Sequence, residues 1–94
     1  MLKAEGVYYF FPATYGMGRS GVPDIVCCVS GKFFAIECKA EGGKPTPLQL
    51  NEIAAIRKSG GIATVTSTNA AEQVRGFIKL IRGGIKPLEI DSEE

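Results

Sequence analysis

The chain contains four short apolar stretches and two longer segments in which apolar residues recur every three or four positions. The short stretches cover residues 7–11, 24–29, 33–39 and 62–66 and are rich in β-branched and aromatic residues. This pattern predicts four β-strands. The periodic segments predict two α-helices, whose inward-facing residues are Leu48, Ile53 and Ile56 in the first and Val74, Phe77, Ile78 and Ile81 in the second.

Signals at the segment ends support this division. Thr46-Pro47-Leu48-Gln49 matches a capping box with proline at the first helical position, and Asn69-Ala70-Ala71-Glu72 gives a second capping pattern. Gly83-Gly84 closes the second helix. Residues 2–5, ending at Gly6, predict only the last turn of a helix, which cannot form alone. The order of a helical turn, three strands, a helix, a strand and a helix predicts an α/β fold.

Length and charge indicate one small domain. The 94 residues allow a single domain, which we place at residues 1–88, and a core this small would gain stability from dimerisation. Four of the ten acidic residues lie in the last six positions, so 89–94 is predicted to be an acidic, solubilising tail. No apolar run approaches the ~18 residues of a membrane span and none resembles a signal peptide. We therefore expect no membrane partner and a cytoplasmic location, in a bacterial or phage-infected host cell.

The cysteine and histidine content restricts the chemistry. Three cysteines without a CxxC spacing fit neither a disulfide framework nor a zinc site, and we interpret them as small core residues in a reducing compartment. The chain has no histidine, which excludes Ser-His-Asp, Cys-His and histidine-ligated metal sites. Catalysis would have to use carboxylates, lysine and a hard cation.

The stretch GMGRSGVPDI, residues 16–25, matches two incompatible signatures. GxGxxG binds a dinucleotide only where its last glycine opens a helix. Here Gly21 is followed by Val22, Pro23 and a β-branched run, which predicts a strand. We interpret the stretch as a glycine-rich loop that leads into a strand, which is compatible with the second signature, the Pro-Asp that opens a metal-nuclease site.

The two central strands bring charged residues onto one face. With Ser30-Gly31 as the hairpin turn, Asp24 lies opposite Glu37; with the turn moved by one residue, it lies opposite Lys39. Opposed carboxylates repel, so such a pair indicates a shared cation such as Mg²⁺, beside which Lys39 could orient water or neutralise a phosphate. Together these residues fit phosphodiester hydrolysis.

The alternative is a surface salt-bridge triad on the wet side of the sheet, because exposed ion pairs are common and weak. Two features favour a site instead. Pro23 stands at the strand entry, where a missing donor is tolerated, and glycine-rich loops at both ends leave the backbone open to a bulky substrate.

Pro23-Asp24 followed by Glu37-Cys38-Lys39 is the PD-(D/E)XK pattern. The chain further resembles the VRR-NUC family, the virus-type replication-repair nucleases, over roughly residues 6–66. The residues that carry the resemblance are Gly21-Val22-Pro23-Asp24, Ile36-Glu37-Cys38-Lys39-Ala40, Gly42-Gly43-Lys44 and Pro47-Leu48-Gln49. It implies a restriction-endonuclease-like αβββαβ core, a mixed sheet flanked by helices, with the first helix truncated here.

The resemblance also implies roles for individual residues. Asp24 and Glu37 would ligate Mg²⁺ or Mn²⁺ with the Cys38 backbone carbonyl, and Lys39 would be the catalytic lysine. Gln49 would be an active-site residue, although it also fits the return partner of the helix cap, and both roles can coexist. Members of the family carry an acidic residue on a fuller first helix, for which Glu5 is the available substitute.

The resemblance implies a homodimeric endonuclease that cuts branched DNA such as four-way junctions, as a Holliday junction resolvase does. Alternatives are a flap or single-strand nuclease, a nickase within a replication-repair complex, or a catalytically silent DNA-binding or protein-interaction module. We expect phosphate contacts from Arg19, Lys32 and Lys44, around the face of the site, although each also fits ordinary solubilising charge.

Overall fold

The computed structural model describes residues 1–13, 21–40, 42–67 and 69–84. The order of elements is the predicted one, with a short first strand and a single turn in place of the first helix. The elements are β1 (Tyr8–Phe10), β2 (Ile25–Val29), β3 (Lys32–Cys38), α1 (Pro47–Lys58), β4 (Ile62–Thr66) and α2 (Ala70–Arg82).

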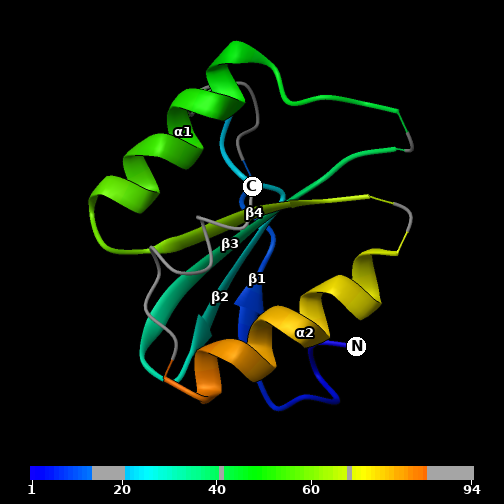
Figure 1. The fold of residues 1–94 in the computed structure, drawn as a ribbon, viewed down its shortest axis with the longest axis vertical. Coiled ribbons are helices and arrows are strands. Elements are labelled where there is room, and N and C mark those ends of the chain that lie inside the picture. The colour runs from blue at the N-terminus through cyan, green and yellow to red at the C-terminus, as the bar shows by residue number, and fades with distance from the viewer. Residues whose placement is uncertain (14–20, 41, 68, 85–94) are drawn as a thin grey trace.

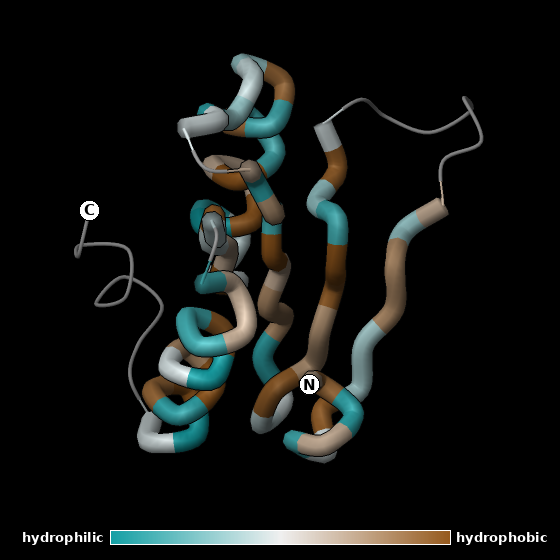
Figure 2. Tube along the Cα trace, turned by 90° about the vertical axis from the view of Figure 1, so that its right-hand side faces the viewer, coloured by the Kyte–Doolittle hydropathy of each residue, from teal (hydrophilic) through white to brown (hydrophobic). Residues whose placement is uncertain are grey.

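The four strands form one mixed sheet in the order β1-β2-β3-β4. β1, β2 and β3 pair antiparallel, whereas β4 pairs parallel to β3 because α1 carries the chain back across the sheet. The two helices lie on opposite faces of the sheet (Figure 1). Figure 2 looks onto the strands and shows both described helices gathered toward β4 and away from β1, which lies at the right-hand edge.

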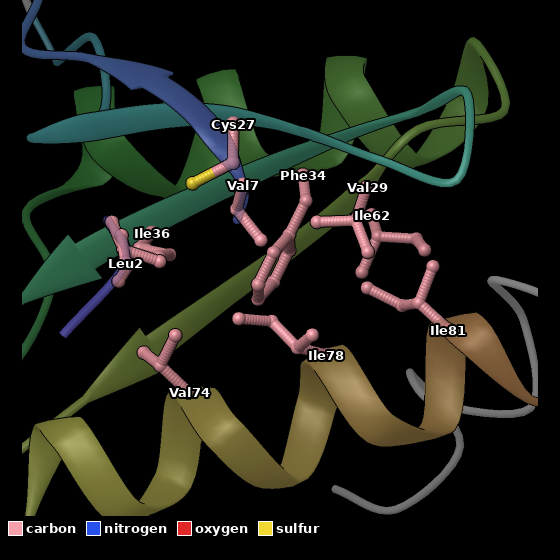
Figure 3. Packing of buried hydrophobic residues seen from close by; sticks show 10 residues of the cluster. All are labelled: Leu2, Val7, Cys27, Val29, Phe34, Ile36, Ile62, Val74, Ile78 and Ile81. Atoms are coloured by element: carbon pink, nitrogen blue, oxygen red, sulfur yellow. The ribbon is translucent and has the colours of Figure 1, made fainter. Parts of the chain in front are cut away.

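The main core lies between the sheet and α2, and Figure 3 shows how its side chains pack. Phe34, Ile36 and Ile62 extend from the sheet toward Ile78 and Ile81 of α2, and all are almost fully buried. A smaller cluster under α1 holds Ala35, Ala63 and Ile53. Alternate residues of β3 therefore serve two different cores, as the period of a strand requires.

Three expectations about local structure are wrong. Leu48, in the first turn of α1, is 54% exposed and does not belong to the cluster under that helix. Cys28 and Cys38 are also exposed, and only Cys27 is a core residue. The capping pattern at Asn69 makes no side-chain cap hydrogen bond; the Gln73 side chain instead accepts from the Ser67 amide at 3.2 Å.

Within the described part of the chain, neither helix has the length and apolar character needed to cross a bilayer. The predicted acidic tail, 89–94, lies outside the described residues.

Candidate active site

The β2–β3 hairpin adopts the first of the two predicted registers. Val29 pairs with Lys32 and Ile25 pairs with Ile36, so the two-residue turn is Ser30-Gly31. Both turn residues have positive φ, 51° and 80°, which is the geometry of a type I′ turn. The register brings Asp24, one residue before β2, beside the end of β3, where its Oδ2 accepts the Cys38 amide hydrogen at 2.8 Å.

Glu37 is buried, with only 3% of its surface exposed. The wet-surface salt bridge is therefore wrong for this residue, because α1 and its small cluster cover this half of the sheet. Lys39 Nζ lies 3.3 Å from Glu37 Oε2, and the lysine side chain is 20% exposed. The pair is thus a largely buried ion pair that opens to solvent on the lysine side.

Gln49 links α1 to this carboxylate. Its Nε2 donates to Glu37 Oε2 at 2.6 Å, while its Oε1 accepts the Thr46 amide hydrogen at 2.9 Å. The Thr46 hydroxyl accepts the Gln49 amide hydrogen at 3.2 Å, which completes the capping box. One glutamine side chain therefore closes the helix cap and reaches the site, so both predicted geometries are present together.

The two oxygens of Glu37 have different surroundings. Oε2 accepts from both Lys39 and Gln49, whereas Oε1 is buried and has no hydrogen-bond partner among the residues that the structure describes. Burial raises the pKa of Glu37 and the carboxylate of Asp24 raises it further, while Lys39 acts in the opposite direction. An unpaired buried carboxylate oxygen is costly and is suited to bind a cation.

The donor set fits a hard divalent cation. Mg²⁺ commonly takes one or two protein carboxylates and completes its octahedron with water and phosphate oxygens. Asp24 and Glu37 supply two carboxylates, and the described residues contain no cluster of three or more acidic, cysteine or histidine side chains. The predicted third ligand, the Cys38 carbonyl, belongs to the residue whose amide contacts Asp24.

The fold resembles that of Hjc, a Holliday junction resolvase from the archaeal hyperthermophile Archaeoglobus fulgidus. The TM-score is 0.53 at 22% identity, and the superposition covers 72% of this chain and 60% of Hjc. The chain has a restriction-endonuclease-like fold.

Among curated proteins, this chain is 49% identical over 51 residues to a protein named "Putative nuclease p44" from Acyrthosiphon pisum secondary endosymbiont phage 1. The match covers 53% of this chain and 52% of the phage protein, so the chain spans about half the length of that relative. No family model matches the sequence. The relative and the fold together support a nuclease.

Two predicted site residues lie elsewhere in the fold. Glu5 contacts α2, where its backbone carbonyl accepts from Arg82 at 2.6 Å and its carboxylate lies 3.9 Å from Arg75, so it does not substitute for the missing acidic residue. Lys32 begins β3 beside the hairpin turn, five residues and roughly 17 Å from Glu37, and on the opposite face. The expectation that Lys32 surrounds the site is therefore wrong.

The other two predicted phosphate contacts differ in position. Lys44 is exposed on the loop that joins Lys39 to α1. Arg19 lies outside the described residues. A further residue, Gly21, was predicted as part of a glycine-rich loop and of the Gly21-Val22-Pro23-Asp24 motif, with no role of its own, yet it packs against the start of α1.

Proposed function

We propose that this chain is a metal-dependent DNA endonuclease. Its active site, formed by Asp24, Glu37 and Lys39, would hydrolyse phosphodiester bonds in the DNA. The observation that carries the proposal is the unpaired, buried Oε1 of Glu37 beside a second carboxylate and a lysine. A hydrogen-bonded structural carboxylate would be expected to have partners on both oxygens. Here two donors hold Oε2 and leave Oε1 available.

Asp24, Glu37 and the Cys38 carbonyl would hold Mg²⁺ or Mn²⁺, which when bound polarises the phosphate and lowers the pKa of water. Lys39 would orient the attacking water or neutralise charge that develops on a phosphate oxygen. Gln49 would fix the carboxylate of Glu37, because its amide is held in turn by the Thr46 cap. Lys44, and Arg19 outside the described residues, would contact the DNA backbone.

The proposed substrate is branched DNA, cut by a homodimer. The support is the likeness to a protein described as a Holliday junction resolvase. A two-fold dimer would place two such sites on opposed strands and make paired cuts.

The test is cleavage of a synthetic four-way junction, a flap and a linear duplex, each with Mg²⁺, with Mn²⁺ and with chelator. Lys39→Ala should lose cleavage by roughly 10²-fold or more, since it removes charge stabilisation at the reacting phosphate. Lys79→Ala, which removes an exposed lysine from α2, is the matched control and should cut like the wild type. Equal cleavage of all three substrates would refute the preference for branched DNA. The absence of metal-dependent cleavage in the wild type would refute the proposal as a whole.

A further inference from the structure

We propose that Gly21 is a positioning residue of the active site, whose backbone fixes the start of α1 against the segment that carries Asp24. The inference rests on the proposed function, because it concerns the geometry of the same site. It assigns to Gly21 a direct packing role.

The contact is between two backbones. A Cβ built on Gly21 would lie 2.6 Å from both the carbonyl carbon and the carbonyl oxygen of Leu48, and 2.8 Å from the amide nitrogen of Gln49. These separations are far shorter than the ordinary contact of ~3.5–4.0 Å between non-bonded heavy atoms. The atoms belong to the peptide group between Leu48 and Gln49, so no rotation of a side chain can make room. Only glycine allows this approach.

The contact joins the two segments that supply the site. Gly21 lies three residues before Asp24, whose Oδ2 is bound to the Cys38 amide. Gly21 contacts the peptide group that joins Leu48 to Gln49, and Gln49 Nε2 donates to Glu37 Oε2 at 2.6 Å. Asp24 and Gln49 are thus linked twice, through the end of β3 and through Gly21. A displacement at Gly21 must move α1 or the segment before Asp24, and either movement separates the groups around Glu37.

Comparison with other glycines shows that close packing against a second backbone segment is not a general feature of glycines in turns. Within the described ranges, Gly6, Gly31, Gly42, Gly60 and Gly84 also have positive φ, and at each of them an added Cβ would have nothing within 4 Å. Gly21 combines a positive φ of 82° with a closely packed neighbour. Its φ explains why glycine is favoured there, and its neighbour explains what that glycine holds in place.

This difference provides a matched control. Gly31 has a φ of 80° and lies in the hairpin turn, at the other end of β3 from Glu37. Gly31→Ala and Gly21→Ala therefore both place an alanine at a φ near 80°, and only Gly21→Ala adds the collision with α1. Any loss of function beyond that of Gly31→Ala measures the collision.

Three measurements should separate the variants. In chelator, the side-chain amide resonances of Gln49 should report the hydrogen bond to Glu37 in the wild type and in Gly31→Ala, and should show its loss in Gly21→Ala. The Kd for Mn²⁺ should rise roughly 10- to 100-fold in Gly21→Ala alone. On a four-way junction kcat should fall by about 10²-fold with little change in KM, because the reacting groups are misplaced while the DNA contacts remain.

A second substitution tests whether the backbone is the obstacle. Truncating the exposed side chain in Leu48→Ala should not restore Gly21→Ala, because the colliding atoms are those of the peptide group. Restoration by Leu48→Ala, or identical behaviour of Gly21→Ala and Gly31→Ala in all three measurements, would overturn the inference. A wild type that binds no Mn²⁺ and cuts no DNA would instead refute the proposed function, while the resonances of Gln49 would still report on the contact.

Gly21→Ala is to be studied with a stabilising osmolyte, because its strain and collision both weaken the fold. If Gly21→Ala does not fold even in osmolyte, the contact between Gly21 and Gln49 can be tested in the wild type. Nuclear Overhauser effects between the α-protons of Gly21 and the amide proton of Gln49 would support the contact, and their absence would overturn it.

Discussion

Glu37 is the residue on which the site depends. Two donors bind one of its oxygens, the other oxygen has no partner within the described part of the chain, and the side chain is buried. Such a carboxylate is unfavourable in a metal-free protein, because burial of a charge without full hydrogen bonding costs free energy. The cost would be offset when a cation binds, so stability, pH and metal should be linked through this residue.

We expect the free energy of unfolding of the metal-free protein to depend on pH through Glu37. Burial raises the pKa of Glu37 in the folded state, whereas a glutamate in the unfolded chain has a pKa of about 4.3. Between that pH and the raised pKa, the folded state binds more protons than the unfolded state, so the free energy of unfolding should fall as pH rises. Urea titrations in chelator should show this slope.

Two further measurements attribute the slope to Glu37. Glu37→Gln should remove that part of the pH dependence, and Glu72→Gln, at an exposed position of α2, should keep it. Mg²⁺ should flatten the slope in the wild type, because it stabilises the ionised carboxylate. A slope that is the same in Glu37→Gln and in the wild type would contradict this account.

The two helices show how similar sequence signals can have different structural consequences. Thr46 and Gln49 exchange two hydrogen bonds at the start of α1, and the same glutamine reaches Glu37. Asn69 occupies the corresponding position before α2, but its side chain makes no cap hydrogen bond. The cap of α1 is thus a structural support of the site, whereas Asn69 contributes only its backbone.

Substitution of each cap residue tests this difference. Thr46→Ala should lower the free energy of unfolding by about 1 kcal/mol, the usual cost of losing an N-cap side chain, and should also reduce cleavage because Gln49 loses its fixed position. Asn69→Ala should change stability by less than about 0.5 kcal/mol and leave cleavage intact. Thermal unfolding and junction cleavage of the two variants measure both effects. Equal effects of the two substitutions would show that the cap of α1 does not support the site.

Most features set by residues close together in the sequence were predicted correctly, whereas several features set by distant residues were not. The hairpin register depends on Ser30-Gly31 and on alternation within two strands, so local rules placed Asp24 beside the end of β3. Side-chain exposure depends on which part of the sheet each helix covers, and local rules do not determine that. Leu48 and Cys28 were for this reason wrongly placed in the core. The packing of Gly21 on α1 joins residues 27 positions apart, which no periodic pattern encodes.

At the scale of the whole molecule, the sheet is covered unequally. α1 packs over Ala35 and Ala63 on β3 and β4, and neither described helix lies over the part of the same face formed by β1 and β2 (Figure 2). Tyr8 and Phe10 of β1 lie on that part of the face, and Phe33 lies beside it on β3, because Tyr8 and Phe33 both pair with Cys28. Their exposed fractions are 72% for Tyr8, 48% for Phe10 and 47% for Phe33. We call these three residues the aromatic face.

The aromatic face is suited to the proposed homodimer. Aromatic side chains bury ~150–250 Å² each, so the exposed fractions leave about 300 Å² per protomer, roughly half of the ~600 Å² per partner at the lower end of specific interfaces. β1 is also an edge strand with one unpaired side among the described strands, which could extend the contact across a two-fold axis. A second copy of this chain would cover both features at once.

The dimer can be tested with one charged substitution on the aromatic face and one outside it. Tyr8→Lys should shift the protein from dimer to monomer in sedimentation equilibrium, because a lysine charge would be buried against the apolar partner. Leu80→Lys replaces another exposed apolar residue, on α2, and should leave the dimer intact. The monomeric Tyr8→Lys should nick a four-way junction on one strand at a time and lose paired cuts, since each protomer keeps its own Asp24, Glu37 and Lys39. A wild type that is monomeric, or a Tyr8→Lys that remains dimeric, would show that the aromatic face does not join two copies.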